Sequence, residues 1–244
     1  MSECVYPNGL PHPPPSLRVR FAAEIGLLTV AAAVFLGLAP KTWQNNGTYI
    51  GLALAMFGFI GFTKTEARER VWGPPDAADF DRVRRCTFYM SMLTIPPLFV
   101  FLVFGALGRH FQVSWLAQGA PPMFSLDFFA ALVLYLPWAL LQQTLFQFYL
   151  LGRLRGILPF ASPLFLSILN GLAYGLVHFR GDWASVPVTL ATIVGGIFWS
   201  YSYYRDRYVL PIAISHALLG TTFYYWVYGH DLLAAFGKFL NAHS

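Results

Sequence analysis

The stretch that decides the fold is Leu141–Arg153, LQQTLFQFYLLGR, an apolar run that carries three glutamines. Residues 128–152 contain no charged side chain, and an uncharged apolar run of this length predicts a helix inside a membrane. Gln143 and Gln147 are four residues apart, so on a helix they share one face, with Gln142 beside them. An unpaired polar group in an apolar span costs several kcal/mol. The glutamines therefore predict hydrogen-bond partners on neighbouring helices.

The composition is that of a membrane protein. Of the 244 residues, 57% are hydrophobic and 11% are charged, whereas a soluble domain carries about 25% charged residues. We expect an all-α, polytopic membrane helical bundle. The net charge of +5 comes without a basic stripe with interleaved aromatic residues, which excludes a nucleic-acid partner. The spacing of Cys4 and Cys86 predicts free thiols rather than a disulfide framework.

Seven apolar segments are long enough, or nearly so, to cross a bilayer as helices. They cover residues 21–38, 47–63, 87–107, 126–151, 161–179, 183–202 and 208–228. Five prolines within residues 1–20 predict a disordered tail before a single transmembrane domain at 21–228. The segment 229–244 is short and amphipathic, so we expect it on the membrane surface. Pro96 and Pro97 predict a kink in the third helix.

Lysine and arginine are distributed unequally between alternate loops. Twelve of the sixteen lie in the tail, in the loop 64–86 and directly after the fourth and sixth segments. Basic residues accumulate on the cytoplasmic side of a membrane. We therefore expect the N-terminus inside and the C-terminus outside, in a bacterial inner (cytoplasmic) membrane.

Two histidines, His178 and His216, lie in later apolar segments, within the sequences YGLVH and LPIAISHA. The order is a polar dipeptide with a third polar residue after it, then aromatic-xxx-His, then a second histidine. This order resembles the CAAX-protease and bacteriocin-processing (CPBP) family, the type II CAAX prenyl endopeptidases, over residues 126–228. The resemblance implies a membrane bundle of eight helices or fewer. It also implies cleavage of lipid-modified or membrane-bound substrates by water that a glutamate and histidines activate, at a site for which a metal has been proposed.

The chain departs from the family motifs Glu-Glu-xxx-Arg, Phe-xxx-His and His-xxx-Asn at five positions. Gln142 and Gln143 replace the glutamates, Gln147 the arginine, Tyr174 the phenylalanine and Gly220 the asparagine. Only His178 and His216 keep their types. A carboxamide cannot take a proton from water near neutral pH, and the carboxylate of a His₂Glu zinc site is missing. We therefore predict that the family-equivalent residues Gln142, Gln143, His178 and His216 are not catalytic.

The same residues are expected to meet in space. We expect the fourth helix to continue to about Leu158, which places Gln142 about 24 Å from that end, and His178 lies about 24 Å from Ser162 on the neighbouring helix. His216 comes within one or two helical turns of that depth. The sequence thus predicts one buried cluster of Gln142 or Gln143 with His178 and His216.

Two functions remain open, and a third is disfavoured. The first is an inactive family member that binds membrane lipids and other membrane proteins, as a subunit, scaffold or assembly factor of a membrane complex, without a cofactor. The second is an endopeptidase with a non-standard site on His178 and His216, which alone would bring a divalent metal to that pair. A small transporter is disfavoured because the chain shows no inverted repeat.

Structural roles are open for the same side chains. His178 and His216 could be hydrogen-bonded core residues, and the glutamines interhelical hydrogen-bonding groups. Asn170 begins a polar stripe beside Gly171 that indicates either close helix packing or the lining of a substrate or lipid cleft. Glu24 is either a paired charge within the membrane or an interfacial one.

Overall fold

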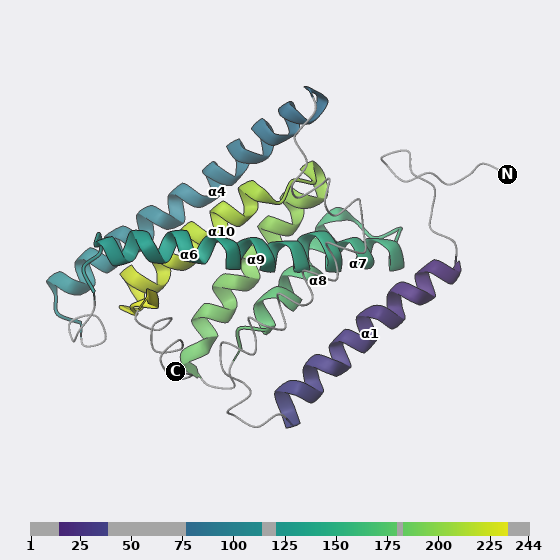
Figure 1. Cartoon of the computed structure of the whole chain (residues 1–244), viewed down its shortest axis with the longest axis horizontal. Helices are drawn as coiled ribbons and strands as arrows, with labels where there is room; N and C mark the ends of the chain where they lie inside the picture. Colours follow the sequence, from purple (N-terminus) through teal and green to yellow (C-terminus); the bar gives the residue numbers. More distant parts are fainter. Residues whose placement is uncertain (1–14, 39–76, 114–120, 180–182, 234–244) are drawn as a thin grey trace. The chain divides into compact units, whose positions relative to one another are not determined.

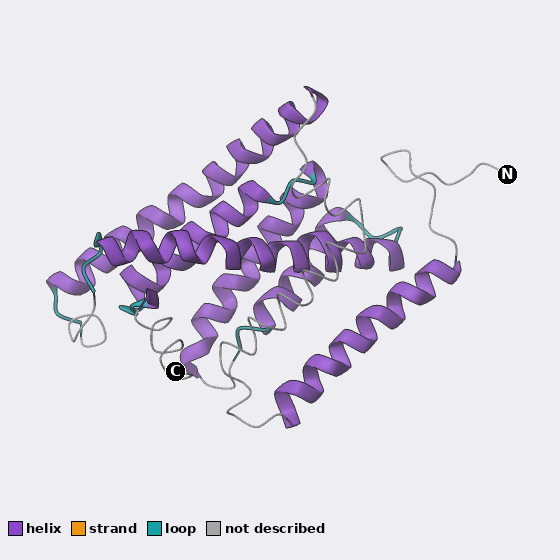
Figure 2. Cartoon of the chain, in the orientation of Figure 1, coloured by secondary structure: helices purple, strands orange, loops and turns teal. Residues whose placement is uncertain are grey.

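The computed structural model describes residues 15–38, 77–113, 121–179 and 183–233. These residues form helices and turns, with no strand among them (Figure 2). The all-α prediction is therefore confirmed. The predicted helix at 47–63, Cys4 and residues 234–244 of the amphipathic segment lie outside the described residues.

The helices follow one another along the chain as Figure 1 labels them. They are α1 (Pro15–Leu38), α4 (Ala77–His110), α6 (Leu126–Gln143), α7 (Leu151–Ile157), α8 (Pro163–Leu176), α9 (Val186–Asp206) and α10 (Leu210–Thr222). Two π-helices, η1 (Thr144–Leu150) and η3 (Phe223–Val227), and a 3₁₀ turn, η2 (Trp183–Ser185), complete the set. Because η1 joins α6 to α7 without a break, residues 126–157 form one long helix.

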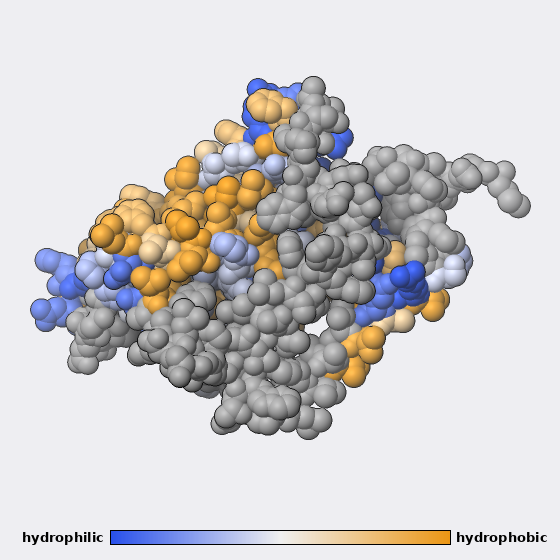
Figure 3. Space-filling model, viewed as in Figure 1, coloured by the Kyte–Doolittle hydropathy of each residue, from blue (hydrophilic) through white to orange (hydrophobic). Residues whose placement is uncertain are grey.

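Two described helices are long and apolar enough to cross a membrane, Phe80–His110 and Leu126–Ile157. Along α4, exposed apolar side chains recur every three or four residues, at Phe88, Met92, Ile95, Phe99 and Val103. Figure 3 shows hydrophobic surface over this part of the molecule. Such a face is suited to contact with lipid. The predicted count of seven membrane-crossing helices stays a prediction.

Several helix ends differ from those predicted. Helix α1 begins at Pro15 rather than residue 21, because proline fits the first turn of a helix, where its missing N–H is not needed. Helix α4 begins at Ala77 rather than residue 87 and continues through both of its prolines. Helix α8 has only 14 residues instead of the predicted run 161–179. Its start is fixed by Ser162, whose hydroxyl accepts a hydrogen bond from the N–H of Phe165 at 3.1 Å.

The end of α8 corrects the expected position of His178. The helix stops at Leu176, and the N–H groups of His178 and Phe179 bond to the carbonyls of Gly175 and Leu176, at 2.9 and 3.1 Å. These tight i to i+3 bonds satisfy carbonyls that a helix end leaves open. His178 therefore lies in the turn after the helix, and the prediction of a helix up to residue 179 was wrong.

The chain divides into two compact units, each described here by itself. Of the described residues, unit 1 holds 15–38, 144–179 and 183–207, and unit 2 holds 77–113, 121–143 and 208–233. One boundary falls between Gln143 and Thr144, where the α-helix becomes a π-helix. The other follows Arg207, which has a left-handed φ of 52°.

In unit 1, α8 and α9 lie side by side at very short range (Figure 1). A Cβ atom on Gly171 would stand 2.6 Å from the backbone nitrogen of Ile197, and one on Gly196 would stand 3.0 Å from the Cα of Gly171. Small residues let helix backbones approach closely in membrane proteins. The close-packing alternative of the sequence analysis is confirmed at Gly171.

In unit 2, the aromatic side chains Phe128, Tyr225 and Trp226 form a core between α6 and η3. Arg109, in the last turn of α4, donates to four backbone carbonyls, those of Gly105, Pro121, Tyr225 and Trp226, at 3.1, 3.1, 2.9 and 3.0 Å. Two of these carbonyls belong to η3. One guanidinium thereby fixes the end of α10 and η3 against α4.

Candidate functional site

The polar dipeptide ends α6. Gln143 is completely buried and Gln142 is half-buried, and both belong to unit 2. Gln147 lies in η1, is also completely buried, and belongs to unit 1. The motif that the sequence presents as one helical face is thus shared between the two units.

Gln147 takes part in a buried hydrogen-bond chain between η1, α8 and α9. The amide nitrogen of Asn170 donates to Gln147 Oε1 at 3.0 Å and to Ser200 Oγ at 2.8 Å. The Ser200 hydroxyl in turn donates to the carbonyl of Gly196 at 2.5 Å. None of these side chains is exposed. The interhelical role expected for the glutamines is confirmed for Gln147.

His178 is half-buried and turned back toward α8. Its Nδ1 lies 3.0 Å from the carbonyl oxygen of Tyr174, which places a proton on Nδ1 because a carbonyl can only accept. Tyr174 itself is fully buried in an aromatic cluster, with its ring centroid 4.8 Å from that of Phe146 and 5.5 Å from that of Trp199. Tyr174, which stands where the family has phenylalanine, therefore contributes to helix packing in unit 1.

His216 lies on α10 and is 3% exposed. Its ring meets Tyr135 of α6 edge to face, with centroids 5.6 Å apart at 84°. The neighbouring Ser215 shares a 2.7 Å hydrogen bond with Thr94 of α4. His216 is thus packed into the core of unit 2.

Tyr135 also explains the glycine at position 220. A Cβ atom on Gly220 would stand 2.8 Å from Cε1 of Tyr135 and 3.1 Å from its hydroxyl. The Tyr135 ring therefore fills the space that an asparagine side chain at 220 would need. The sequence analysis missed Tyr135, although its position seven residues before Gln142 places both on one helical face and could have indicated it.

The four candidate residues are distributed over both units. Gln142, Gln143 and His216 belong to unit 2, and His178 belongs to unit 1. The expected cluster of Gln142 or Gln143 with His178 and His216 stays a prediction. The depth argument for His178 is weakened, because the residue lies beyond the end of α8 rather than inside it.

The buried polar groups of the described residues are almost all neutral. They comprise amides, hydroxyls and His216, and Asp206 is the one carboxylate among them. Asp206 accepts two hydrogen bonds from Arg205, at 2.9 and 2.6 Å. Within the described residues no three histidine, cysteine or acidic side chains stand close enough to hold a metal ion. This donor set does not fit the metal that the family implies.

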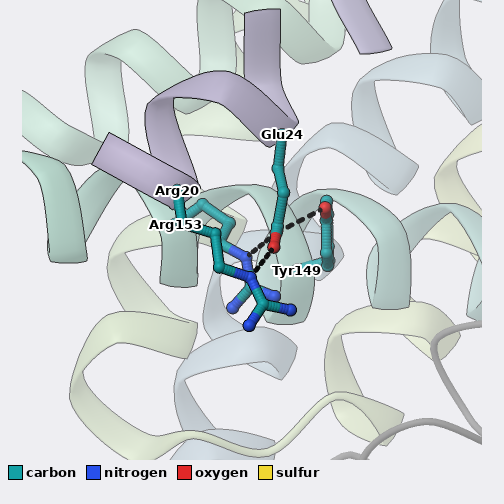
Figure 4. Close-up of polar contacts among 4 residues, drawn as sticks. All are labelled: Arg20, Glu24, Tyr149 and Arg153. Atoms are coloured by element: carbon teal, nitrogen blue, oxygen red, sulfur yellow. Dashed lines mark hydrogen bonds and ion pairs between the residues drawn. The ribbon is translucent and has the colours of Figure 1, made fainter. Parts of the chain in front are cut away.

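A second polar site joins α1 to the helix that follows the glutamines (Figure 4). Glu24 accepts hydrogen bonds from Arg20 Nε at 3.0 Å, Arg153 Nε at 2.7 Å and the Tyr149 hydroxyl at 3.1 Å. All four residues belong to unit 1. Of the two alternatives for Glu24, the paired charge is confirmed.

Comparison with known families supports the resemblance. Residues 123–222 match the family described as type II CAAX prenyl endopeptidase Rce1-like. This range runs from just before α6 to the end of α10 and contains all four candidate residues. No curated protein and no solved structure matches the chain.

Proposed function

Because residues 123–222 form a domain of the Rce1-like, CPBP-type family of membrane proteins, we propose that the chain is an inactive member of it. It acts by binding, as a subunit, scaffold or assembly factor of a membrane complex. Its partners are membrane lipids and other membrane proteins, and it needs no cofactor. Its N-terminus lies inside and its C-terminus outside, in the bacterial inner membrane.

One observation carries this proposal. Among the buried polar side chains of the described residues, the only carboxylate is Asp206, and Arg205 already engages it. Both motif glutamates are glutamines. Activation of water requires a base, and a histidine without a carboxylate has nothing to stabilise its imidazolium form. Loss of a general base lowers a rate by roughly 10²–10⁴-fold.

The surroundings of two motif positions suit the residues that this chain has there, which supports a non-catalytic role. Tyr135 fills the space beside Gly220, so the family's asparagine has no room there. Gln147, at the arginine position, is bonded to the neutral amide of Asn170. A charged side chain in its place would be buried without an opposite charge, at a cost of about 2.5–3.5 kcal/mol on membrane-insertion scales.

The alternative is an endopeptidase that uses His178 and His216. Their retention at the family's histidine positions is the observation in its favour. Such an enzyme would cleave lipid-modified or membrane-bound substrates. It would use imidazole as the base, or a divalent metal at this pair.

The two functions are separated by one comparison. The purified full-length protein and its His178→Ala, His216→Ala variant are incubated with prenylated, membrane-anchored peptides, and cleavage products are quantified. We expect no histidine-dependent product. A partner that co-purifies in stoichiometric amount supports the binding role, whereas product formed by the wild type and lost in the variant establishes the endopeptidase.

A restored variant shows whether the inactivity comes from the motif alone. Gln142→Glu, Gln143→Glu and Gln147→Arg rebuild the first motif, with Tyr135→Ala and Gly220→Asn added in a second version. Because Tyr135 blocks position 220, any recovered cleavage should require the second version. Thermal unfolding of each variant controls for loss of the fold.

A further inference from the structure

Two arginines of unit 1 share a single carboxylate. Arg20 and Arg153 each use only the Nε of the guanidinium to reach Glu24, one on each carboxylate oxygen. In Figure 4 the two guanidinium groups lie together on one side of Glu24, with Tyr149 on the other. Two cations and one carboxylate leave one positive charge in excess at this place.

The hydrogen bonds to Glu24 do not involve the terminal amino groups of either arginine. The Arg153 guanidinium is held in position by the rings of Phe21 and Tyr149, whose centroids lie 4.4 and 4.8 Å from its Cζ. The Arg20 side chain is 72% exposed and the Arg153 side chain 12% exposed. The Arg153 guanidinium is thus held in place before any ligand binds, and a ligand can approach from the exposed Arg20 side.

We propose that Arg20 and Arg153 bind the phosphate of an anionic phospholipid. Guanidinium groups present their N–H donors in a planar fork that matches the oxygens of a phosphate. Glu24 holds two like charges close together, and a phosphate supplies the negative charge that the cluster lacks. Binding would use the terminal amino groups, which the hydrogen bonds to Glu24 do not occupy.

The exposed apolar surface of α1 favours a lipid over a soluble anion as the ligand of the two arginines. Leu27 lies seven residues after Arg20 on the same face of α1, about 10.5 Å further along the helix, and is 70% exposed. Val30, one turn after Leu27, is 59% exposed. A phosphodiester at Arg20 would place its acyl chains along these side chains. Arginines at the end of an apolar helix are suited to anionic headgroups of the membrane surface.

The test measures lipid binding to the full-length protein purified in detergent. Phosphatidylglycerol and phosphatidylcholine are titrated separately, and bound lipid is counted by native mass spectrometry. Arg20→Gln should weaken phosphatidylglycerol binding about fivefold, the effect of one basic residue at an anionic surface. Arg84→Gln is the matched control, because Arg84 is 77% exposed and pairs, among the described residues, with Asp81 at 3.4 Å.

Each result is decisive. A preference of the wild type for phosphatidylglycerol, reduced by Arg20→Gln and unchanged by Arg84→Gln, supports the site. Equal binding of the two lipids, or equal loss in both variants, overturns it. Displacement of phosphatidylglycerol by inorganic phosphate assigns the arginines to a soluble anion and overturns the lipid. If Arg20→Gln proves unstable, Arg20→Lys, which keeps the charge but loses the fork, should show a smaller loss of affinity.

Discussion

Asn170 connects three helical elements of unit 1 through one side-chain nitrogen. Asn170→Ala should lower the free energy of unfolding by about 1–3 kcal/mol, because Gln147 Oε1 would be buried without its donor. Adding Gln147→Leu removes that stranded acceptor, so the double variant should lose less than the two single variants together. Unfolding of the detergent-purified protein measures all three. Strictly additive losses would argue that the bond contributes nothing.

The Tyr135 ring limits the size of the side chain that position 220 can accommodate. Gly220→Ala should destabilise unit 2 by about 1–3 kcal/mol through overpacking against the Tyr135 ring. In a Tyr135→Leu background the same substitution should cost much less. Gly26→Ala is the control, because a Cβ atom there meets nothing within 4 Å. Equal penalties at both glycines would mean that Tyr135 does not limit position 220.

For single residues, the sequence shows which positions belong to the motifs, but it does not show which side chains surround them. The retained histidines and the replaced glutamates were visible as motif positions. Tyr135 was not, because a motif compares residue types at fixed spacings and carries no information on volume. Glu24 could be recognised as exceptional by its apolar neighbours, but its partner Arg153 is far along the chain and only the fold brings them together.

Among the helix contacts, that of α8 with α9 depends on glycines, which have no side chain to separate the two backbones. Gly171→Ala should destabilise the protein, because a Cβ atom at 2.6 Å from the Ile197 nitrogen meets backbone that cannot rotate away. Gly152→Ala, in α7, meets nothing within 4 Å and should stabilise the helix by up to about 1 kcal/mol. Thermal unfolding of the two variants gives shifts of opposite sign. Shifts of the same sign would contradict the tight packing.

The existence of the helices could be predicted, and their ends in part. Apolar length predicted α6 and α4 because burial in lipid demands it. It could not predict the end of α8 after Leu176, since the apolar residues Val177 and Phe179 on either side of His178 continue the apolar run. Nor could it predict that η1 is a π-helix, because the i to i+5 bonds depend on packing against other helices.

For the whole molecule, the unequal distribution of basic residues gives a testable topology. After replacement of Cys4 and Cys86, single cysteines at Arg84 and Lys238 should react with a membrane-impermeant maleimide from opposite faces of the membrane. Arg84 is 77% exposed, so its position is accessible to the reagent. Labelling of both from one face would exclude seven membrane-crossing helices with the N-terminus inside.

The division into two units shows what the sequence leaves undetermined at this scale. The apolar run through the glutamines continues unchanged from residue 128 to 152, yet the boundary between the units falls within it, after Gln143. Which helices pack together depends on contacts between residues far apart in the chain. Periodicity along one helix carries no record of those contacts.

The pairing of Glu24 has a consequence for the order in which the protein is made. Glu24 and Arg153 are 129 positions apart, so at about 5–20 residues per second the ribosome needs roughly 6–26 s to deliver the second after the first. During that interval an unpaired carboxylate would oppose the predicted insertion of α1 into the bilayer. Arg20, only four residues before Glu24, is present from the beginning and can neutralise it on the nascent helix. On the nascent helix only Arg20 can pair with the carboxylate, whereas in the folded protein both arginines bind it.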